Sequence, residues 1–98
     1  MGNQIETVSV VALGLSPWAA RVDGLVCAFL EAGCEFAPAH EVRAAVCYAA
    51  YLRHAQAAHV YVLTATAFGR GLAVRGFGVV KRGGFKYRLG LRLRGGAQ

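Results

Sequence analysis

The side chains that could support acid–base or metal chemistry are sparse in this sequence and follow no catalytic pattern. All five carboxylates lie within the first 41 residues, and none is spaced like the paired groups that general acid–base catalysis requires. His40, Cys47 and His54 recur every seven residues, which predicts one shared face of a helix. Neighbours in that series would lie about 10 Å apart, too far to share a metal ion. We therefore predict a protein with no catalytic residue and no metal site.

One glycine-rich stretch, Gly69-Arg70-Gly71, raises the question of a nucleotide cofactor. A dinucleotide-binding loop requires a third glycine and a strand–loop–helix unit around it, and neither surrounds this stretch. Glycine is common in turns because it adopts backbone conformations that other residues avoid. We interpret Gly69 and Gly71 as a turn between two strands, and we predict no cofactor.

The distribution of charge points to an acidic partner. The first 58 residues carry three basic residues and all five acids, whereas residues 59–98 carry eight basic residues and no acid. Such a stretch sets up a strong local positive potential. Contact with an anion such as RNA and a merely solvated basic surface both remain open. The candidate contact residues are Arg70, Arg75, Lys81, Arg82, Lys86, Arg88, Arg92 and Arg94.

Aromatic residues are interleaved with the basic ones near the C-terminus. Phosphates attract Arg and Lys, and unpaired bases stack on aromatic rings. Strict alternation over Phe85–Leu93 would place the aromatic and leucine side chains on one face and the basic side chains, with Gly90, on the other. We therefore predict that Phe85 and Tyr87 belong to the core and that the basic face of this strand is an electrostatic contact patch.

The C-terminus carries the most specific short motif of the chain, Leu93-Arg94-Gly95-Gly96. Proteases that cut after a glycine pair have a narrow channel that only glycine can pass, and they anchor a leucine upstream. Ubiquitin ends in the same letters as residues 91–96, and papain-like proteases of nidoviruses recognise a related pattern. We predict a cleavage site after Gly96 within a flexible tail over residues 95–98. A tail without a processing role remains the alternative.

Two helices are predicted. Ser16 is a suitable N-cap, Pro17 follows at the first helical position, and Gly33 is the expected C-cap. The alanine-rich segment His40–Gln56 has high helix propensity and predicts the second helix. The first helix has an apolar stripe that consists of Trp18, Val22, Leu25, Val26, Phe29 and Leu30.

The other segments are predicted as strands, because they are rich in β-branched and apolar residues or alternate apolar with basic side chains. Two glycines interrupt the fourth of them, which indicates a bulge. Strands and helices in this order predict a single α+β domain over residues 1–94. The predicted strands are Ile5–Leu13, Cys34–Ala37, Val60–Ala67, Leu72–Val80 and Phe85–Leu93, and Lys81–Gly84 is predicted as a hairpin turn.

Sequence features also bear on where the protein acts. The longest uncharged runs are shorter than the roughly 18 residues that a membrane-spanning helix needs, so we expect no membrane segment. No basic region precedes the first apolar run, as a secretory signal would require. Cys27, Cys34 and Cys47 are odd in number and lack metal-site spacing. We expect reduced thiols in an intracellular protein.

The layout of the chain resembles the coronavirus leader protein family, non-structural protein 1, in its short alphacoronavirus form. The resemblance spans nearly the whole chain as an order of elements, and only the tail motif is specific in letters. Two departures are Arg88 and Arg92, where the family usually carries acids, and the more helical segment His40–Gln56. Apart from the first strand, the matching segments are Ala32-Gly33, the extended piece that reaches Pro38, His59–Val62, Gly76–Val80 and Tyr87–Leu93, followed by Arg94-Gly95-Gly96.

The resemblance implies a small irregular β-barrel of about six mostly antiparallel strands, with the first helix covering one end. It implies a viral virulence factor of the host cytoplasm that suppresses host gene expression, chiefly translation, without catalysis. Its partners would be RNA or the host translation machinery, and a viral papain-like protease would cut at the glycine pair Gly95-Gly96. Two other hypotheses remain open: a ubiquitin-like modifier precursor cut after Gly96, and a small basic RNA-binding module.

Overall fold

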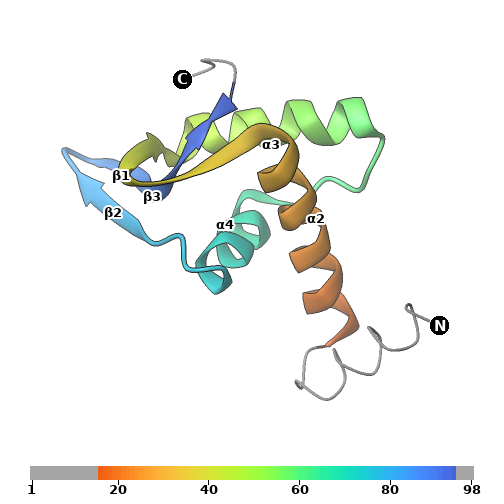
Figure 1. The fold of residues 1–98 in the computed structure, drawn as a ribbon. Coiled ribbons are helices and arrows are strands. Elements are labelled where there is room, and N and C mark those ends of the chain that lie inside the picture. The colour runs from red at the N-terminus through yellow and green to blue at the C-terminus, as the bar shows by residue number, and fades with distance from the viewer. Residues whose placement is uncertain (1–15, 95–98) are drawn as a thin grey trace.

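The computed structural model describes residues 16–94, in which three helices accompany one three-stranded antiparallel sheet (Figure 1). β3 is the central strand of the sheet, with β1 and β2 at its edges. α3 packs against β1 and β3, while α2 packs against β1, α3 and α4. In chain order the elements are α2 (Pro17–Gly33), β1 (Cys34–Arg43), α3 (Ala44–Ala58), α4 (Ala65–Val74), β2 (Val79–Arg82) and β3 (Phe85–Leu93).

The α+β class predicted from the sequence is confirmed, but the barrel is not. The sheet of the described residues has three strands and stays open, whereas the resemblance implied about six strands closed into a barrel. Two predicted strands, Val60–Ala67 and Leu72–Val80, are largely connection and helix instead. The predicted strand Ile5–Leu13 lies outside the described residues.

α2 forms where its local signals predicted it. The Ser16 hydroxyl accepts a hydrogen bond from the Ala19 N–H at 3.0 Å, and Pro17 occupies the first turn. An N-cap of this kind typically stabilises a helix by about 1 kcal/mol. The predicted C-cap is one residue early, because the helix includes Gly33. Most of the predicted apolar stripe faces the core, and its buried members are Val22, Val26 and Phe29, whereas Trp18 is 50% exposed.

The second predicted helix is confirmed, but it begins later than expected. α3 starts at Ala44, because the residues before it continue β1, which pairs with β3 on both sides of an irregularity around Pro38. Proline is tolerated at such an irregularity, where its missing N–H breaks no ladder bond. His40 therefore belongs to β1, and the predicted helical face shared by His40, Cys47 and His54 is wrong.

The predicted strand Val60–Ala67 and the predicted turn at Gly69 and Gly71 are both wrong. The chain runs as a connection up to Thr64, whose hydroxyl caps α4. Gly71 lies inside this helix, where an added Cβ would come within 2.6 Å of Val26 Cγ2. A glycine there lets α4 approach α2 closely. Packing between the two helices thus overrides the local β preference of the segment.

β2 and β3 form a tight hairpin. Gly83 and Gly84 have positive φ angles of 58° and 84°, as a two-residue type I′ turn requires. The register pairs Arg82 with Phe85 directly across this turn. The predicted turn is therefore confirmed at its two glycines, whereas Lys81 and Arg82 belong to β2.

A bulge at Gly90 reverses the predicted faces of β3 over residues 85–89, whereas Leu91 and Leu93 are buried and Arg92 is exposed as predicted. Gly90 has a φ of 88°, and the register with β1 shifts at this point. Arg88 and Leu91 are both buried beneath the helices, although strict alternation would separate them. Phe85 is 50% exposed on the other face, and Tyr87 lies half-buried beside it. The predicted core positions of Phe85 and Tyr87 and the predicted surface position of Arg88 are therefore wrong.

The core joins the three helices to β3. Tyr51 of α3 is fully buried and stacks on Phe68 of α4 with 4.6 Å between the ring centres. The Tyr51 hydroxyl accepts a hydrogen bond from the Leu63 N–H at 3.1 Å. The Tyr48 hydroxyl donates to the Leu63 carbonyl at 2.7 Å. These two bonds hold the connection between α3 and α4 against the core.

Candidate nucleic-acid interface

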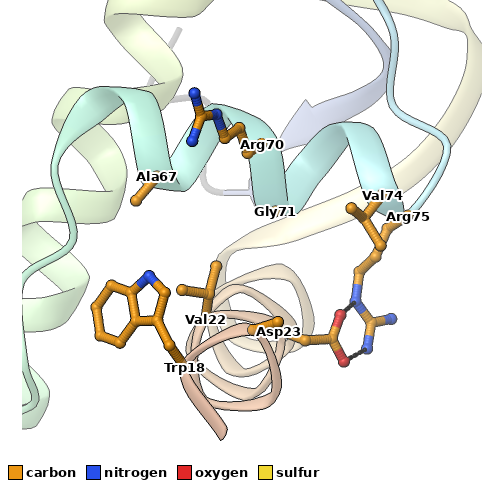
Figure 2. Close-up of a pocket in the computed structure, with 9 residues that line it drawn as sticks. Trp18, Val22, Asp23, Ala67, Arg70, Gly71, Val74 and Arg75 are labelled. Atoms are coloured by element: carbon orange, nitrogen blue, oxygen red, sulfur yellow. Dashed lines mark hydrogen bonds and ion pairs between the residues drawn. The ribbon is translucent and has the colours of Figure 1, made fainter. Parts of the chain in front are cut away.

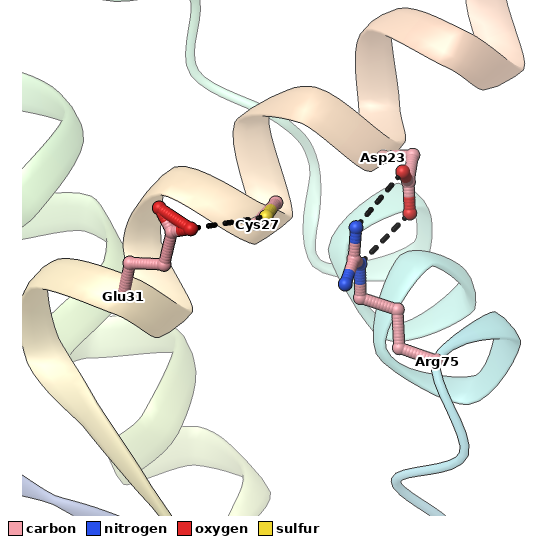
Figure 3. Close-up of polar contacts among 4 residues, drawn as sticks. All are labelled: Asp23, Cys27, Glu31 and Arg75. Carbon is pink, nitrogen blue, oxygen red and sulfur yellow. Dashed lines mark hydrogen bonds and ion pairs between the residues drawn. The ribbon is translucent and has the colours of Figure 1, made fainter.

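Three of the eight predicted contact residues pair with acids from the first half of the chain. Arg75, just after α4, forms two hydrogen bonds with Asp23 of α2, Nε to Oδ1 at 2.9 Å and Nη2 to Oδ2 at 3.0 Å (Figure 3). These bonds raise the pKa of Arg75. Further along α2, the Cys27 thiol donates to Glu31 at 3.8 Å. Arg75 thus links two helices and is not a free contact residue.

The other two pairs join strands of the sheet. Arg82 Nη2 of β2 lies 2.7 Å from Glu41 Oε1 of β1, and Arg92 of β3 binds Glu35, its register partner in β1. The hydrogen bond from Arg92 lowers the pKa of Glu35. The partners in the three pairs are 41, 52 and 57 residues apart in sequence. The positive half and the negative half of the chain therefore neutralise each other in part within one fold.

Backbone carbonyls hold two further predicted contact residues. Arg88 is only 9% exposed and donates from Nη1 to the Phe77 carbonyl at 2.9 Å. Burial lowers the pKa of this guanidinium. Arg94 stays exposed, but its Nε donates to the Cys34 carbonyl at 2.9 Å. The alternation of β3 had placed Arg88 on a free surface, and the structure places it under the helices.

Arg70, Lys81 and Lys86 are the remaining predicted contact residues. All three are exposed, and none of their side chains forms an ion pair or a hydrogen bond with another residue between 16 and 94. Lys81 and Lys86 face each other across the hairpin, whereas Arg70 borders a groove between α2 and α4. The structure therefore does not gather the eight predicted residues into one patch.

The sheet surface turned away from α3 combines aromatic and basic side chains. The guanidinium carbon of Arg43 lies 4.0 Å from the centre of the Phe85 ring, and that of Arg82 lies 5.2 Å from the centre of the Tyr87 ring. Leu89 adds an exposed apolar side chain to the same strand. We call the surface formed by Arg43, Arg82, Phe85, Tyr87 and Leu89 the open sheet face.

Arg43 is the basic residue of this surface that the sequence analysis missed, and Phe85, Tyr87 and Leu89 were expected on the apolar face. The predicted helix His40–Gln56 separates it from the last strand, whereas β1 in fact continues to Arg43 and pairs it with Tyr87. Interleaved basic and aromatic residues were the signal that pointed to this region. The faces became clear only with the bulge at Gly90 and the register of β1.

A groove of about 420 Å³ lies between α2 and α4. Side chains of the two helices face each other across it, and the ion pair between Asp23 and Arg75 closes one end (Figure 2). The half-exposed Trp18 ring stands at the other end. The walls are mainly apolar, so the groove offers no cluster of phosphate contacts. They include Trp18, Ala19, Val22, Ala67, Gly71 and Val74.

The two buried thiols, Cys34 and Cys47, are poor nucleophiles. Cys27, Cys34 and Cys47 are all free. Burial raises the pKa of Cys34 to about 11 and that of Cys47 to about 12, so both stay protonated near neutral pH.

Among residues 16–94, no group of three or more His, Cys, Asp or Glu side chains is placed to hold a metal ion. The helices in this range are too short or too polar to cross a membrane.

The predicted protease motif straddles the end of the fold. Leu93 is 3% exposed at the end of β3 and pairs with Cys34 of β1. Gly95 and Gly96 lie outside the described residues. A protease that anchors Leu93 would first have to withdraw this side chain from the core.

No protein-family model matches the sequence, and a search of curated proteins gives no significant match.

Proposed function

We propose that this chain is a non-catalytic RNA-binding protein that holds single-stranded RNA on its open sheet face. The observation that carries the proposal is the placement of Arg43 over the half-exposed Phe85 ring, with Arg82 over Tyr87 beside it. Unpaired bases stack on aromatic rings and on guanidinium planes, and guanidinium groups also contact phosphates. An aromatic ring with a guanidinium group beside it can therefore bind the base and the phosphate of one nucleotide.

The spacing of the two rings favours a single strand over a duplex. Phe85 and Tyr87 lie two residues apart on β3, so their side chains share one face at about 7 Å along the strand. Neighbouring bases of an extended strand can each take one ring. Bases in a duplex are already stacked on one another and offer no free ring face.

Arg43 carries most of the available charge of this face. Glu41 neutralises Arg82 through an ion pair at 2.7 Å, whereas Arg43 contacts no carboxylate among residues 16–94. The net charge of +6 on the whole chain adds a longer-range attraction for polyanions. Phe85 and Arg43 are therefore the two residues whose loss should reduce binding most.

Fluorescence anisotropy with a labelled single-stranded RNA of about ten nucleotides tests the proposal. Phe85→Ala should weaken binding by about 5- to 150-fold, because stacking of one base on an aromatic ring contributes about 1–3 kcal/mol. Arg53→Ala removes an exposed cation on α3 and serves as the matched control, with affinity expected to stay unchanged. Equal losses from both variants, or equally tight binding of duplex RNA, would contradict the open-face model.

The narrower role suggested by the resemblance is suppression of host translation by a viral leader protein in the host cytoplasm. Its physical support is a surface suited to RNA. A reporter assay in mammalian cells tests this role: the wild-type chain should lower reporter synthesis, and Phe85→Ala at equal expression should restore it. Normal reporter synthesis with the wild-type chain would contradict the viral role and leave RNA binding as a separate question.

A further inference from the structure

A second polar site lies on the opposite side of the sheet, where α3 and α4 both begin. A pocket of about 530 Å³ opens there, within the range of known small-molecule sites. The first residues of both helices line it together with two cations of β3. These lining residues are Ala44 and Ala45 of α3, Ala65 and Thr66 of α4, and Lys86 and Arg88 of β3.

Both helix N-termini carry backbone donors that no side chain of residues 16–94 is seen to cap. The N–H groups in the first turn of a helix have no intrahelical acceptor, and the helix dipole makes this end positive. The N-cap of α3 is Arg43, whose side chain makes no capping bond. In α4, the Thr64 hydroxyl takes up the Ala67 N–H at 3.1 Å and leaves the two N–H groups before it free of that cap. Neither first turn carries an acidic residue, the usual partner of such an end.

Arg88 adds a largely buried cation to the pocket wall. Its side chain is nine-tenths buried, and its single hydrogen bond within residues 16–94 uses Nη1 and the Phe77 carbonyl. Nη2 lies at the pocket wall beside Gly69, where an added Cβ would come within 3.2 Å of it. A buried cation without an opposite charge is unfavourable, and no acidic residue between 16 and 94 lines the pocket.

Two lysines extend the positive charge to the mouth of the pocket. Lys86 lines the pocket, and Lys81 lies directly across the hairpin from it. Like charges directly opposite each other in a sheet are destabilising. An anion between the lysines and the helix ends relieves this repulsion and the uncompensated charge of Arg88 together.

We propose that this pocket binds a phosphate monoester, either of a free mononucleotide or of the 5′ end of an RNA. The donors converge from three sides: the N-termini of α3 and α4, and Lys86 with Arg88 of β3. A tetrahedral phosphate dianion can accept hydrogen bonds from donors on several sides, and helix N-termini commonly bind phosphate groups. Tyr48 and Phe68 form an apolar wall that suits the rest of a nucleotide. The site uses none of the side chains of the open sheet face. Phosphate binding here can therefore be tested independently of RNA stacking on that face.

Thermal unfolding of the full chain with sodium phosphate, against sodium chloride at equal ionic strength, gives the first test. A ligand that binds only the folded state raises the melting temperature, so phosphate should raise it and chloride should not. Lys86→Gln should weaken phosphate binding at least five-fold. The matched control Arg53→Gln should keep wild-type binding. Identical effects of the two salts, or wild-type phosphate binding by Lys86→Gln, would overturn the proposal.

A carboxylate placed in the pocket gives a test that does not depend on removing Arg88, whose loss endangers folding. Ala65→Glu puts an acid at the start of α4, beside Lys86 and Arg88. It should raise the melting temperature without phosphate and abolish the further rise with phosphate. A lower melting temperature together with an unchanged phosphate response would show that the cations do not converge on this position.

Titration with uridine, uridine 5′-monophosphate and RNA octamers with a 5′-phosphate or a 5′-hydroxyl identifies the source of the phosphate. Monophosphate should bind at least ten-fold more tightly than uridine, and equal affinities would overturn the site. Preference for the phosphorylated octamer over its hydroxyl form, lost in Lys86→Gln, assigns the site to RNA ends. Binding of the monophosphate alone assigns it to a free nucleotide. Phe85→Ala should change octamer binding and leave inorganic phosphate binding unaffected.

Discussion

The two faces of the sheet around β3 use basic residues in opposite ways. On the helix side, Arg88 is buried and holds a backbone carbonyl, while on the other side Arg43 and Arg82 lie over exposed rings. α3 packs on the first face and α4 borders Arg88 there, whereas Phe85 and Leu89 on the second face are exposed. The role of a basic residue therefore follows from what covers it. The same kind of substitution should unfold the protein on one face and impair binding on the other.

Arg88→Glu should have the largest effect on stability. The new carboxylate would be buried beside the Phe77 carbonyl, and breaking a buried charged contact typically costs about 3–5 kcal/mol. That is comparable with the total stability of a small domain. Arg92→Glu reverses an exposed charge on the same strand and should leave the protein folded. Urea unfolding followed by circular dichroism compares the two, and equal losses would show that the two faces of β3 are wrongly assigned.

Gly71→Ala tests how closely the covered side is packed. The added methyl would lie 2.6 Å from Val26 Cγ2, and overpacking of this kind costs about 1–3 kcal/mol. Gly24→Ala in α2 is the matched control, because nothing lies within 4 Å of its Cβ position. Alanine at that position should stabilise the helix by up to about 1 kcal/mol. Opposite signs in thermal unfolding are expected, and stabilisation by both changes would contradict the close α2–α4 contact.

Arg43→Ala should alter binding more than stability. Removing an exposed cation–π contact lowers the free energy of unfolding by about 0.5–1 kcal/mol. If Arg43 also contacts one phosphate, the slope of log K against log salt should fall by about 0.7 for a single-stranded RNA. Anisotropy titrations at several salt concentrations measure this slope. An unchanged slope would mean that Arg43 supports Phe85 without touching the RNA backbone.

The smallest effect concerns the exposed pair of Glu35 and Arg92. Hydrogen bonding to Arg92 lowers the pKa of Glu35 from 4.5. A carboxyl group with a lowered pKa in the folded state stabilises the protein above its unfolded pKa, and this contribution is lost as pH falls through the folded value. Arg92→Gln should therefore reduce the fall in melting temperature on acidification below pH 4.5, the ordinary pKa of this carboxyl group. Identical pH profiles of variant and wild type would indicate that the pair does not form in solution.

The parts of the fold that could be predicted depend on neighbours in sequence. Ser16 and Pro17 start α2 through a cap that spans three residues, and Gly83-Gly84 forms the hairpin through its own backbone angles. In each case the residues that determine the local structure lie within a few positions of one another in the sequence.

The segment after α3 shows where this approach fails. Val60–Ala67 has the composition of a strand, yet α4 begins at Ala65, because Phe68 and Leu72 are buried in the core and Gly71 fits against Val26. Contacts with a helix more than forty residues earlier stabilise this choice, and composition within the segment contains no trace of them.

The sequence by itself determined the α+β class, the first helix, the hairpin and an uneven distribution of charge. Only the tertiary structure decided that Asp23, Glu35 and Glu41 would neutralise arginines 41 to 57 residues away. It also decided that Arg43 would lie over Phe85 and that Arg88 would be buried. Both outcomes depend on the register between β1 and β3, two strands that are distant in the chain. The pairing of these strands sets the register, and the register shifts at the bulge at Gly90.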